Sequence, residues 1–316
     1  MFYILLFATG YANAQDTSTI NDTITAANNN VVEKIDSGKR QWLVGGGSAL
    51  VYGSSFIFLN QAWYKDYPRS SLHSFDDSGE WLQMDKIGHG WTAYHSSRVN
   101  TRLWQWAGVK HKNAVWLGTG TSLAYMLAIE YLDGRSAEWG WSWPDAGADF
   151  FGAALFATQE LAWREQKISL KFSSSPHSYQ PADVQQRANA LFGSSLPEKL
   201  LKDYNTQTYW LSFNLKSLFK SIDVPDYLNI AFGYSGEGMF GGYENVGRDK
   251  EGNIVFDGRD ILRYRQWLLS ADIDLTKIKT NSRFLRSVFS VVNVLKIPAP
   301  TLELSNGRIK GHWLYF

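Results

Sequence analysis

Four apolar stretches, each long enough to form a helix, follow one another between Trp42 and Arg164. They run from about 42 to 63, 84 to 106, 112 to 132 and 142 to 164, and polar or turn residues bound each of them. Such stretches must be buried against one another or in lipid. We therefore expect a bundle of about four hydrophobic helices in the N-terminal half.

The ends and charges of these stretches refine that expectation. The first is free of charge and long enough to cross a bilayer. The second begins with Asp85, Lys86 and His89, and this much charge argues against contact with lipid on all sides. The fourth begins with Ser142-Trp143-Pro144-Asp145, in which serine is a favoured helix cap and proline fits the first turn. Asp133-Gly134 is a good stop signal for the third helix.

Patterns of period two dominate after Lys167. Apolar residues recur at every second position in 208–215, 227–234 and 266–275, which is typical of half-buried strands. Asn306-Gly307 separates two further strand-like segments and favours a tight hairpin turn. The polar stretch 242–260 indicates an exposed loop or a short hairpin. The fold class predicted is α+β: a bundle of about four hydrophobic helices followed by an antiparallel β-rich half. We expect the sheet to pack one apolar face on the helical half and to leave the other face to solvent or a partner.

The N-terminus has the features of an export signal. A short apolar run from Phe2 is followed by Ala12-Asn13-Ala14, a small-residue cleavage pattern before Gln15. We predict a signal peptide at 1–14, a polar leader at 15–40, a helical domain at 41–166 and a β-rich domain at 167–316. An amphipathic helix is expected near 183–203. The chain is therefore expected in the cell envelope, in the periplasm or at the outer membrane.

Composition excludes several classes of function. Lys and Arg number 31 against 30 Asp and Glu, without the clustered basic face of a nucleic-acid-binding protein. The sequence contains no cysteine, which excludes disulfides, thiol catalysis, Cys-ligated metals and a lipid-attachment cysteine within it. Eleven of the 14 tryptophans lie between Trp42 and Trp163. Either a membrane interface or a dense aromatic core explains this density. The partners expected are membrane lipid or an envelope protein.

A small set of ionisable residues stands out within the helical half. On a helix, Asp85 and His89 share one face and Lys86 lies beside them, while Asp145 and Asp149 form a second pair at the same spacing. If the helices bundle, these side chains can converge at one end. The candidate polar cluster comprises Asp85, Lys86, His89, Glu130, Asp145 and Asp149. Among them, His89, Asp85 and Asp149 are the candidate ligands for a divalent metal.

Three interpretations of this cluster remain open. A Lys86–Asp salt bridge and a hydrogen-bonded His89 would simply hold helices together. The same groups could bind a ligand or a lipid headgroup, or they could bind metal or perform acid/base chemistry. The sequence lacks a nucleophile elbow, a Walker loop and an HExxH motif. A membrane-associated protein with a structural or binding role is expected, with a metal-dependent or acid/base envelope hydrolase as the alternative.

The helical half resembles a known group of proteins. Asp85-Lys86-x-x-His89, Glu130 and Ser142-Trp143-Pro144-Asp145-x-x-x-Asp149 resemble the YfiM-like predicted periplasmic proteins, and the first motif is similar to VanZ-like membrane proteins. The C-terminal half is similar to the β-rich extension of Bacteroidota members. The resemblance implies an envelope location but no activity or cofactor. Members are often lipoproteins, a property that a sequence without cysteine does not support.

Overall fold

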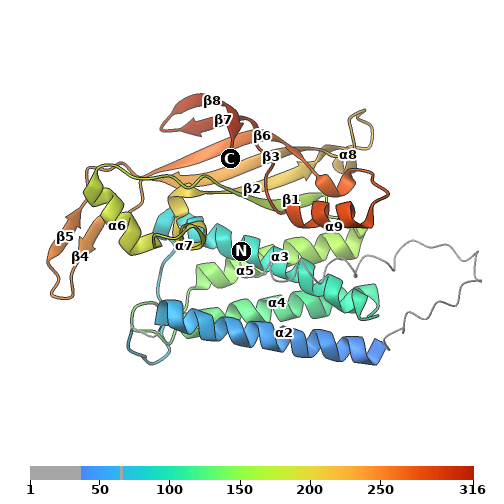
Figure 1. The fold of residues 1–316 in the computed structure, drawn as a ribbon, viewed down its shortest axis with the longest axis horizontal. Helices are drawn as coiled ribbons and strands as arrows, with labels where there is room; N and C mark the ends of the chain where they lie inside the picture. The colour runs from blue at the N-terminus through green and yellow to red at the C-terminus, as the bar shows by residue number, and fades with distance from the viewer. Residues whose placement is uncertain (1–36, 65–66) are drawn as a thin grey trace, which may run out of the picture. The chain divides into compact units, whose positions relative to one another are not determined.

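The computed structural model describes residues 37–64 and 67–316, so the predicted signal peptide and residues 15–36 of the predicted leader lie outside the described residues. The chain is α+β, as predicted, with long helices followed by an antiparallel sheet (Figure 1). It divides into two compact units. The helical unit contains Thr92–Arg164 and the described residues up to Phe75. The sheet unit contains Glu165–Phe316 together with Asp76–Trp91.

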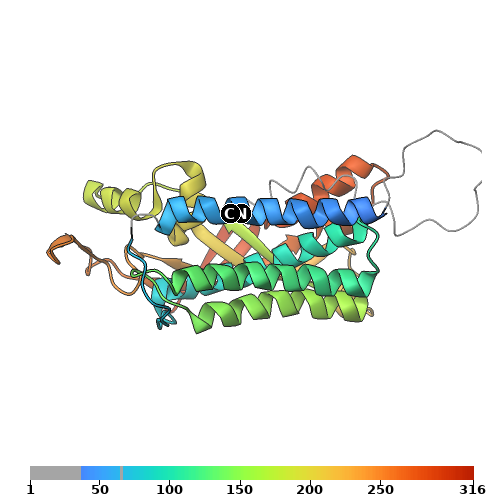
Figure 2. The ribbon, with the colours of Figure 1, turned by 90° about the horizontal axis from the view of Figure 1, so that it is seen from below.

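Four long helices occupy the four apolar stretches and confirm that prediction. They are α2 (Ser37–Leu59), which continues into a π-helical turn (Asn60–Tyr64), α3 (Met84–Trp106), α4 (His111–Asp133) and α5 (Trp143–Trp163). The axes of α2, α4 and α5 run roughly parallel in both views (Figure 2). The predicted caps are also present: α4 ends at Asp133 before Gly134, and the Ser142 hydroxyl accepts a hydrogen bond from the Asp145 amide at 3.0 Å.

Small and polar side chains fill the inside of the helical unit. Ala93 of α3, Met126 of α4 and Ala153 of α5 belong to one buried cluster. Asn100 donates a hydrogen bond to the Tyr52 hydroxyl at 2.6 Å, so α2 joins α3 through polar groups. The buried polar residues also include Ser48, Ser55, Ser97, Thr101, Thr119, Ser122 and Gln159. Small residues and interhelical hydrogen bonds are the contacts that join helices in lipid.

Large apolar side chains point outward from the same helices. Trp42 is 84% exposed and Leu50 71% exposed on α2. The exposed set on α4 and α5 comprises Trp116, Leu117, Leu127, Tyr131, Trp143, Phe150, Phe151 and Trp163. Among the described residues, α2 is the helix with the length and apolar composition needed to cross a membrane. The helical unit thus buries many polar side chains beside one apolar cluster and exposes large apolar side chains.

The sheet unit is built on six antiparallel strands in the order β1-β2-β3-β6-β7-β8. Their bounds are β1 Ile168–Ser174, β2 Gln207–Asn214, β3 Leu228–Glu237, β6 Tyr264–Ile273, β7 Ala299–Ser305 and β8 Arg308–Tyr315. Asn306 and Gly307 have φ values of 49° and 69°, which confirms the predicted hairpin turn with two left-handed residues. Strands β4 (Val246–Arg248) and β5 (Ile254–Asp257) form the short hairpin expected in the polar stretch.

Short helices complete the sheet unit. Gly193 separates α6 (Ala182–Phe192) from α7 (Leu196–Lys202) in the region where the sequence predicts one amphipathic helix. The remaining helices are α8 (Leu215–Leu218) and α9 (Arg283–Val292), with single turns at Glu80–Gln83, Tyr204–Thr206 and Leu275–Lys277.

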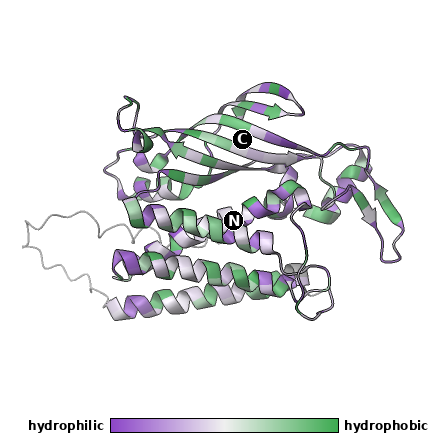
Figure 3. Cartoon of the chain, turned by 180° about the vertical axis from the view of Figure 1, so that it is seen from behind, coloured by the Kyte–Doolittle hydropathy of each residue, from purple (hydrophilic) through white to green (hydrophobic). Residues whose placement is uncertain are grey.

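The sheet alternates as predicted; its polar side is buried along most of the strands, and its apolar side is buried at β1. Figure 3 shows apolar and polar residues following one another along the strands. The buried side carries Ser169, Lys171, Ser212, Asn214, Asn229, Gln266, Asp272, Thr301, Glu303 and Ser305, with Trp210, Ala231 and Leu268 between them. The apolar side is covered at β1 and β2, where Phe172 and Tyr209 contact Trp91 of α3, but it is exposed on β3, β6 and β7. Alternation fixes which residues share a side but not which part of that side is covered.

A hydrogen-bonded ionic network explains how the buried side tolerates charge. The Lys171 ammonium lies 2.7 Å from an Asp272 carboxylate oxygen, which also accepts a hydrogen bond from the Ser212 hydroxyl at 2.7 Å. The Lys296 ammonium lies 4.0 Å from the other Asp272 oxygen and 5.0 Å from the centre of the Trp210 ring. Burial lowers the pKa of Lys296 to about 8, even though Asp272 opposes that shift.

This pKa gives the stability of the protein a defined pH dependence. The pKa of Lys296 is lower in the folded protein than in the unfolded chain, so the unfolded chain binds more protons between about pH 8 and 10.5. The free energy of unfolding is expected to gain roughly 2–3 kcal/mol from this residue across that window, and the gain is absent below pH 8. Urea unfolding at several pH values tests this. The increase in the free energy of unfolding between pH 8 and 10.5 should be smaller in Lys296→Met. It should be unchanged in the surface control Lys250→Met.

Candidate functional site

A left-handed turn directly precedes α3 and fixes the position of its first residues. Trp81, Leu82 and Gln83 have φ values of 48°, 51° and 67°, a conformation that costs non-glycine residues roughly 1–2 kcal/mol each. Contacts within the sheet unit hold the turn: the Trp81 amide donates to the Gly242 carbonyl at 2.8 Å, and the Tyr234 hydroxyl donates to the Leu82 carbonyl at 2.5 Å. The turn is followed at once by Met84 and Asp85, the first residues of α3.

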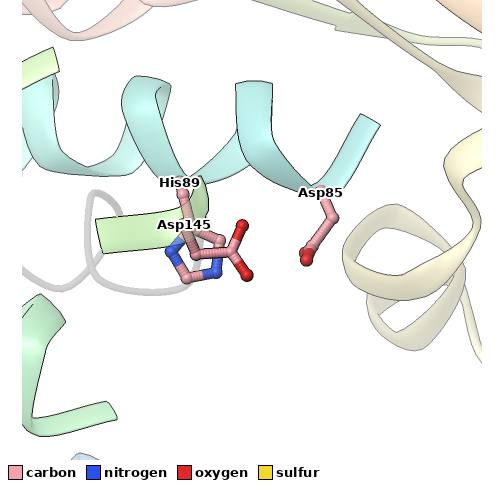
Figure 4. A group of neighbouring side chains, drawn as sticks. All are labelled: Asp85, His89 and Asp145. Carbon is pink, nitrogen blue, oxygen red and sulfur yellow. The ribbon is translucent and has the colours of Figure 1, made fainter. Parts of the chain in front are cut away.

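Asp85, Lys86 and His89 lie together in the sheet unit. Asp85 and His89 project from the same side of α3, one turn apart (Figure 4). Asp85 accepts a hydrogen bond from the Tyr204 hydroxyl at 2.6 Å and another from Lys86 at 3.3 Å. Burial opposes the ionisation of Asp85, but the charges of His89 and Lys86 together with these hydrogen bonds hold its pKa below the ordinary value. Asp85 is thus an anionic carboxylate beside His89.

Lys86 has a structural partner of the kind expected for a salt bridge. Its ammonium contacts the Asp77 carboxylate, and both side chains are about one-tenth exposed. A buried pair of this kind compensates the charges of both residues. Lys86 therefore neutralises acidic groups at the start of α3.

Glu130, Asp145 and Asp149 lie together in the helical unit. The Ser142 amide donates to a Glu130 carboxylate oxygen at 3.2 Å, which ties the end of α4 to the start of α5. Asp145 follows in the first turn of α5, and Asp149 lies one turn later on the same side. Glu130, Asp145 and Asp149 are at most 4% exposed. Three buried carboxylates within a few turns need positive charge or protons close to them, since desolvated anions are costly.

The structure thus groups the six predicted residues into two sets of three, one in each unit. Two contributors had not been predicted: Asp77, which pairs with Lys86, and Tyr204, which donates to Asp85. The acidic pair Asp76-Asp77 just before the second apolar stretch was a signal that could have identified the first. Tyr204 lies 119 residues from Asp85 in the chain, and no local pattern connects them.

Comparison with known proteins places the candidate residues within one family segment. Residues 74–159 match the model of a family described as "Predicted periplasmic lipoprotein (DUF2279)", and all six candidate residues fall within this range. Neither the curated proteins nor the solved structures give a match. The narrower YfiM-like and VanZ-like resemblances remain predictions. Over less than half of its length, the chain is therefore similar to a family of predicted periplasmic proteins, which supports an exported protein of the cell envelope.

Proposed function

We propose that this chain is a membrane-associated envelope protein that binds a divalent cation at the buried carboxylates of the helical unit. The observation that carries the proposal is the gathering of Glu130, Asp145 and Asp149, each at most 4% exposed, at the end of α4 and the start of α5. Carboxylates are preferred ligands of divalent cations. Because the family segment 74–159 includes all the candidate ligands, the proposal concerns the part of the chain that resembles the family.

Helix periodicity brings the carboxylates of α4 and α5 together. Met126 of α4 and Ala153 of α5 belong to one buried cluster. One turn from this cluster, the same helix faces carry Glu130 and Asp149. A further turn toward the start of α5 carries Asp145.

The chemistry of these carboxylates suits a hard divalent cation. Glu130, Asp145 and Asp149 each offer oxygen ligands. Oxygen ligands suit Mg²⁺, Mn²⁺ or Ca²⁺. No observation favours the hydrolase alternative over binding, and binding is the role that we propose.

The membrane part of the proposal rests on the polarity of the helical unit. In water, helices bury apolar residues and expose polar ones. Here Ser, Thr and Asn are buried, whereas Trp42, Trp116 and Phe150 are exposed. Tryptophan is enriched where a protein meets the headgroup region of a membrane. Fractionation of envelope membranes then distinguishes the outer membrane from the inner one.

Thermal melts with and without metal test the cation site. At one hundred times the dissociation constant, binding stabilises the wild type by about 2.7 kcal/mol, or roughly 4–8 °C in Tm. We expect this shift with Mn²⁺ or Mg²⁺ in detergent and its loss in Glu130→Gln and Asp149→Asn. The control is His111→Ala, a half-buried histidine that begins α4 at the opposite end from Glu130, and it should keep the shift.

Two results would contradict the site. A wild type whose Tm responds to none of Mn²⁺, Mg²⁺ and Ca²⁺ leaves Glu130, Asp145 and Asp149 with a purely structural role. A full metal shift retained in both variants places the binding elsewhere. Isothermal titration of the folded variants separates lost binding from lost stability.

A further inference from the structure

The exposed side of the sheet forms continuous apolar rows. Tyr234 pairs with Trp267, Trp267 with Leu304, and Leu304 with Ile309 across β3, β6, β7 and β8. The next row joins Phe232, Leu269, Leu302 and Gly311. Residues directly opposite on antiparallel strands share a side of the sheet. We call this surface the outer sheet face; its exposed members are Ile230, Phe232, Trp267, Leu269, Leu302, Leu304, Ile309 and Trp313.

The polarity of the sheet is the reverse of that expected in water. Apolar residues fill the rows of the outer sheet face, with the exposed Arg265 at one end of β6, while the opposite side buries Lys171, Asp272 and Glu303. Antiparallel sheets of water-soluble proteins cover their apolar face and expose the polar one. An exposed apolar surface that spans four strands exceeds the isolated apolar residues of an ordinary protein surface and marks a contact site.

Helix α9 also buries polar residues and exposes apolar ones, and it carries positive charge. Its buried residues are Ser287 and Ser290, whereas Phe284 is 72% exposed. Arg283 and Arg286 are exposed beside that phenylalanine. A helix with exposed apolar residues and neighbouring arginines is typical of a bilayer surface, where acyl chains meet anionic headgroups. The uncharged rows of the outer sheet face and the exposed face of α9 are thus two features of the sheet unit that suit lipid.

A hollow in the outer sheet face has the chemistry of an acyl-chain contact. Its volume is about 480 Å³, and it is lined mainly by apolar residues, including Ile230, Leu269, Pro300, Leu302 and Trp313. Trp313 is 90% exposed at its margin. A hydrocarbon chain needs no hydrogen-bond partner, so a hollow of this kind accepts it without leaving polar groups unsatisfied.

We propose that the outer sheet face and α9 lie against the acyl chains of a phospholipid bilayer. The sheet unit alone carries this inference, so it is independent of the cation site. It extends the proposed membrane association to a second surface. In this arrangement the uncharged rows contact hydrocarbon and the arginines of α9 contact phosphate headgroups.

Site-specific labelling tests the proposal in the full chain. The sequence has no cysteine, so single variants carry one fluorophore at a defined place. Leu302→Cys and Trp313→Cys report the outer sheet face, and Glu251→Cys reports an exposed turn between β4 and β5. Each labelled protein is reconstituted into vesicles of phosphatidylcholine and phosphatidylglycerol. Lipids brominated on their acyl chains should quench positions 302 and 313 several-fold more strongly than 251, and aqueous iodide should show the opposite order.

Each alternative result has a defined meaning. Iodide quenching at 302 and 313 as strong as at 251 places the face in water and overturns the proposal. Protection from both quenchers, with self-quenching between labelled copies, identifies a second copy as the occupant and also overturns it. Co-flotation with the vesicles measures whether the protein associates with membranes by any surface. If the protein floats with the vesicles but brominated lipids do not quench positions 302 and 313, the sheet contact is excluded and the proposed function is unaffected.

Discussion

Replacing Asp272 by alanine is expected to destabilise the folded protein by about 3–5 kcal/mol, because removing one partner of a buried ion pair leaves uncompensated charge. Asp272 is fully buried and lies 2.7 Å from the ammonium of Lys171, with Lys296 at 4.0 Å from its other oxygen. Denaturant unfolding measures the loss. The control is Asp257→Ala, since Asp257 pairs with Arg259 on the surface and its loss should leave the unfolding midpoint close to the wild type.

A second variant separates charge from packing at the same place. Replacing the three residues together, as Lys171→Met, Lys296→Met and Asp272→Leu, removes all three charges and keeps most of the volume. Such replacements are often neutral or stabilising. The triple variant is therefore expected to be more stable than Asp272→Ala. An Asp272→Ala protein as stable as Asp257→Ala would show that the network contributes little.

Gly118→Ala is expected to destabilise the helical unit by about 1–3 kcal/mol or more, because α3 and α4 are in close contact at this position. A methyl group at Gly118 would lie 2.4 Å from the backbone nitrogen of Thr101, and a backbone atom cannot yield as a flexible side chain does. Two residues along the same helix, a methyl group at Gly120 meets nothing within 4 Å. Gly120→Ala should therefore stabilise by roughly 0.5–1 kcal/mol, the usual gain from replacing a helical glycine.

The opposite signs of these two changes make the comparison decisive. Both variants alter the same helix in the same chemical way, so the difference in unfolding free energy isolates the contact with Thr101. Equal effects of Gly118→Ala and Gly120→Ala would mean that the helices do not approach each other as closely as described.

Local signals in the sequence predicted much of the fold. The Ser142 cap, the stop at Gly134 and the Asn306-Gly307 turn depend on backbone geometry within a few residues, and all three are present. The grouping of Asp85 with Lys86 and His89 follows from helix periodicity alone. Such features need no knowledge of distant parts of the chain.

The features that the sequence did not predict depend on contacts between distant segments. The hydrogen bond from Tyr204 to Asp85 and the left-handed turn at Trp81 require the sheet unit to be in place. The period-two pattern of the strands also did not predict which side of the sheet is buried. Alternation of apolar and polar residues is the same for a sheet in water and a sheet in lipid, and only the surroundings decide which face is covered.

The division of the chain within α3 bears on how such a protein can evolve. The sheet unit takes Asp76–Trp91 from the middle of the sequence, and the helix then continues into the helical unit at Thr92. If a gene were divided near residue 165, the strands of the sheet unit would be separated from Asp76–Trp91, which belongs to the same unit. Recombination at that junction therefore cannot exchange either half as an intact module, and the two halves are expected to be inherited together.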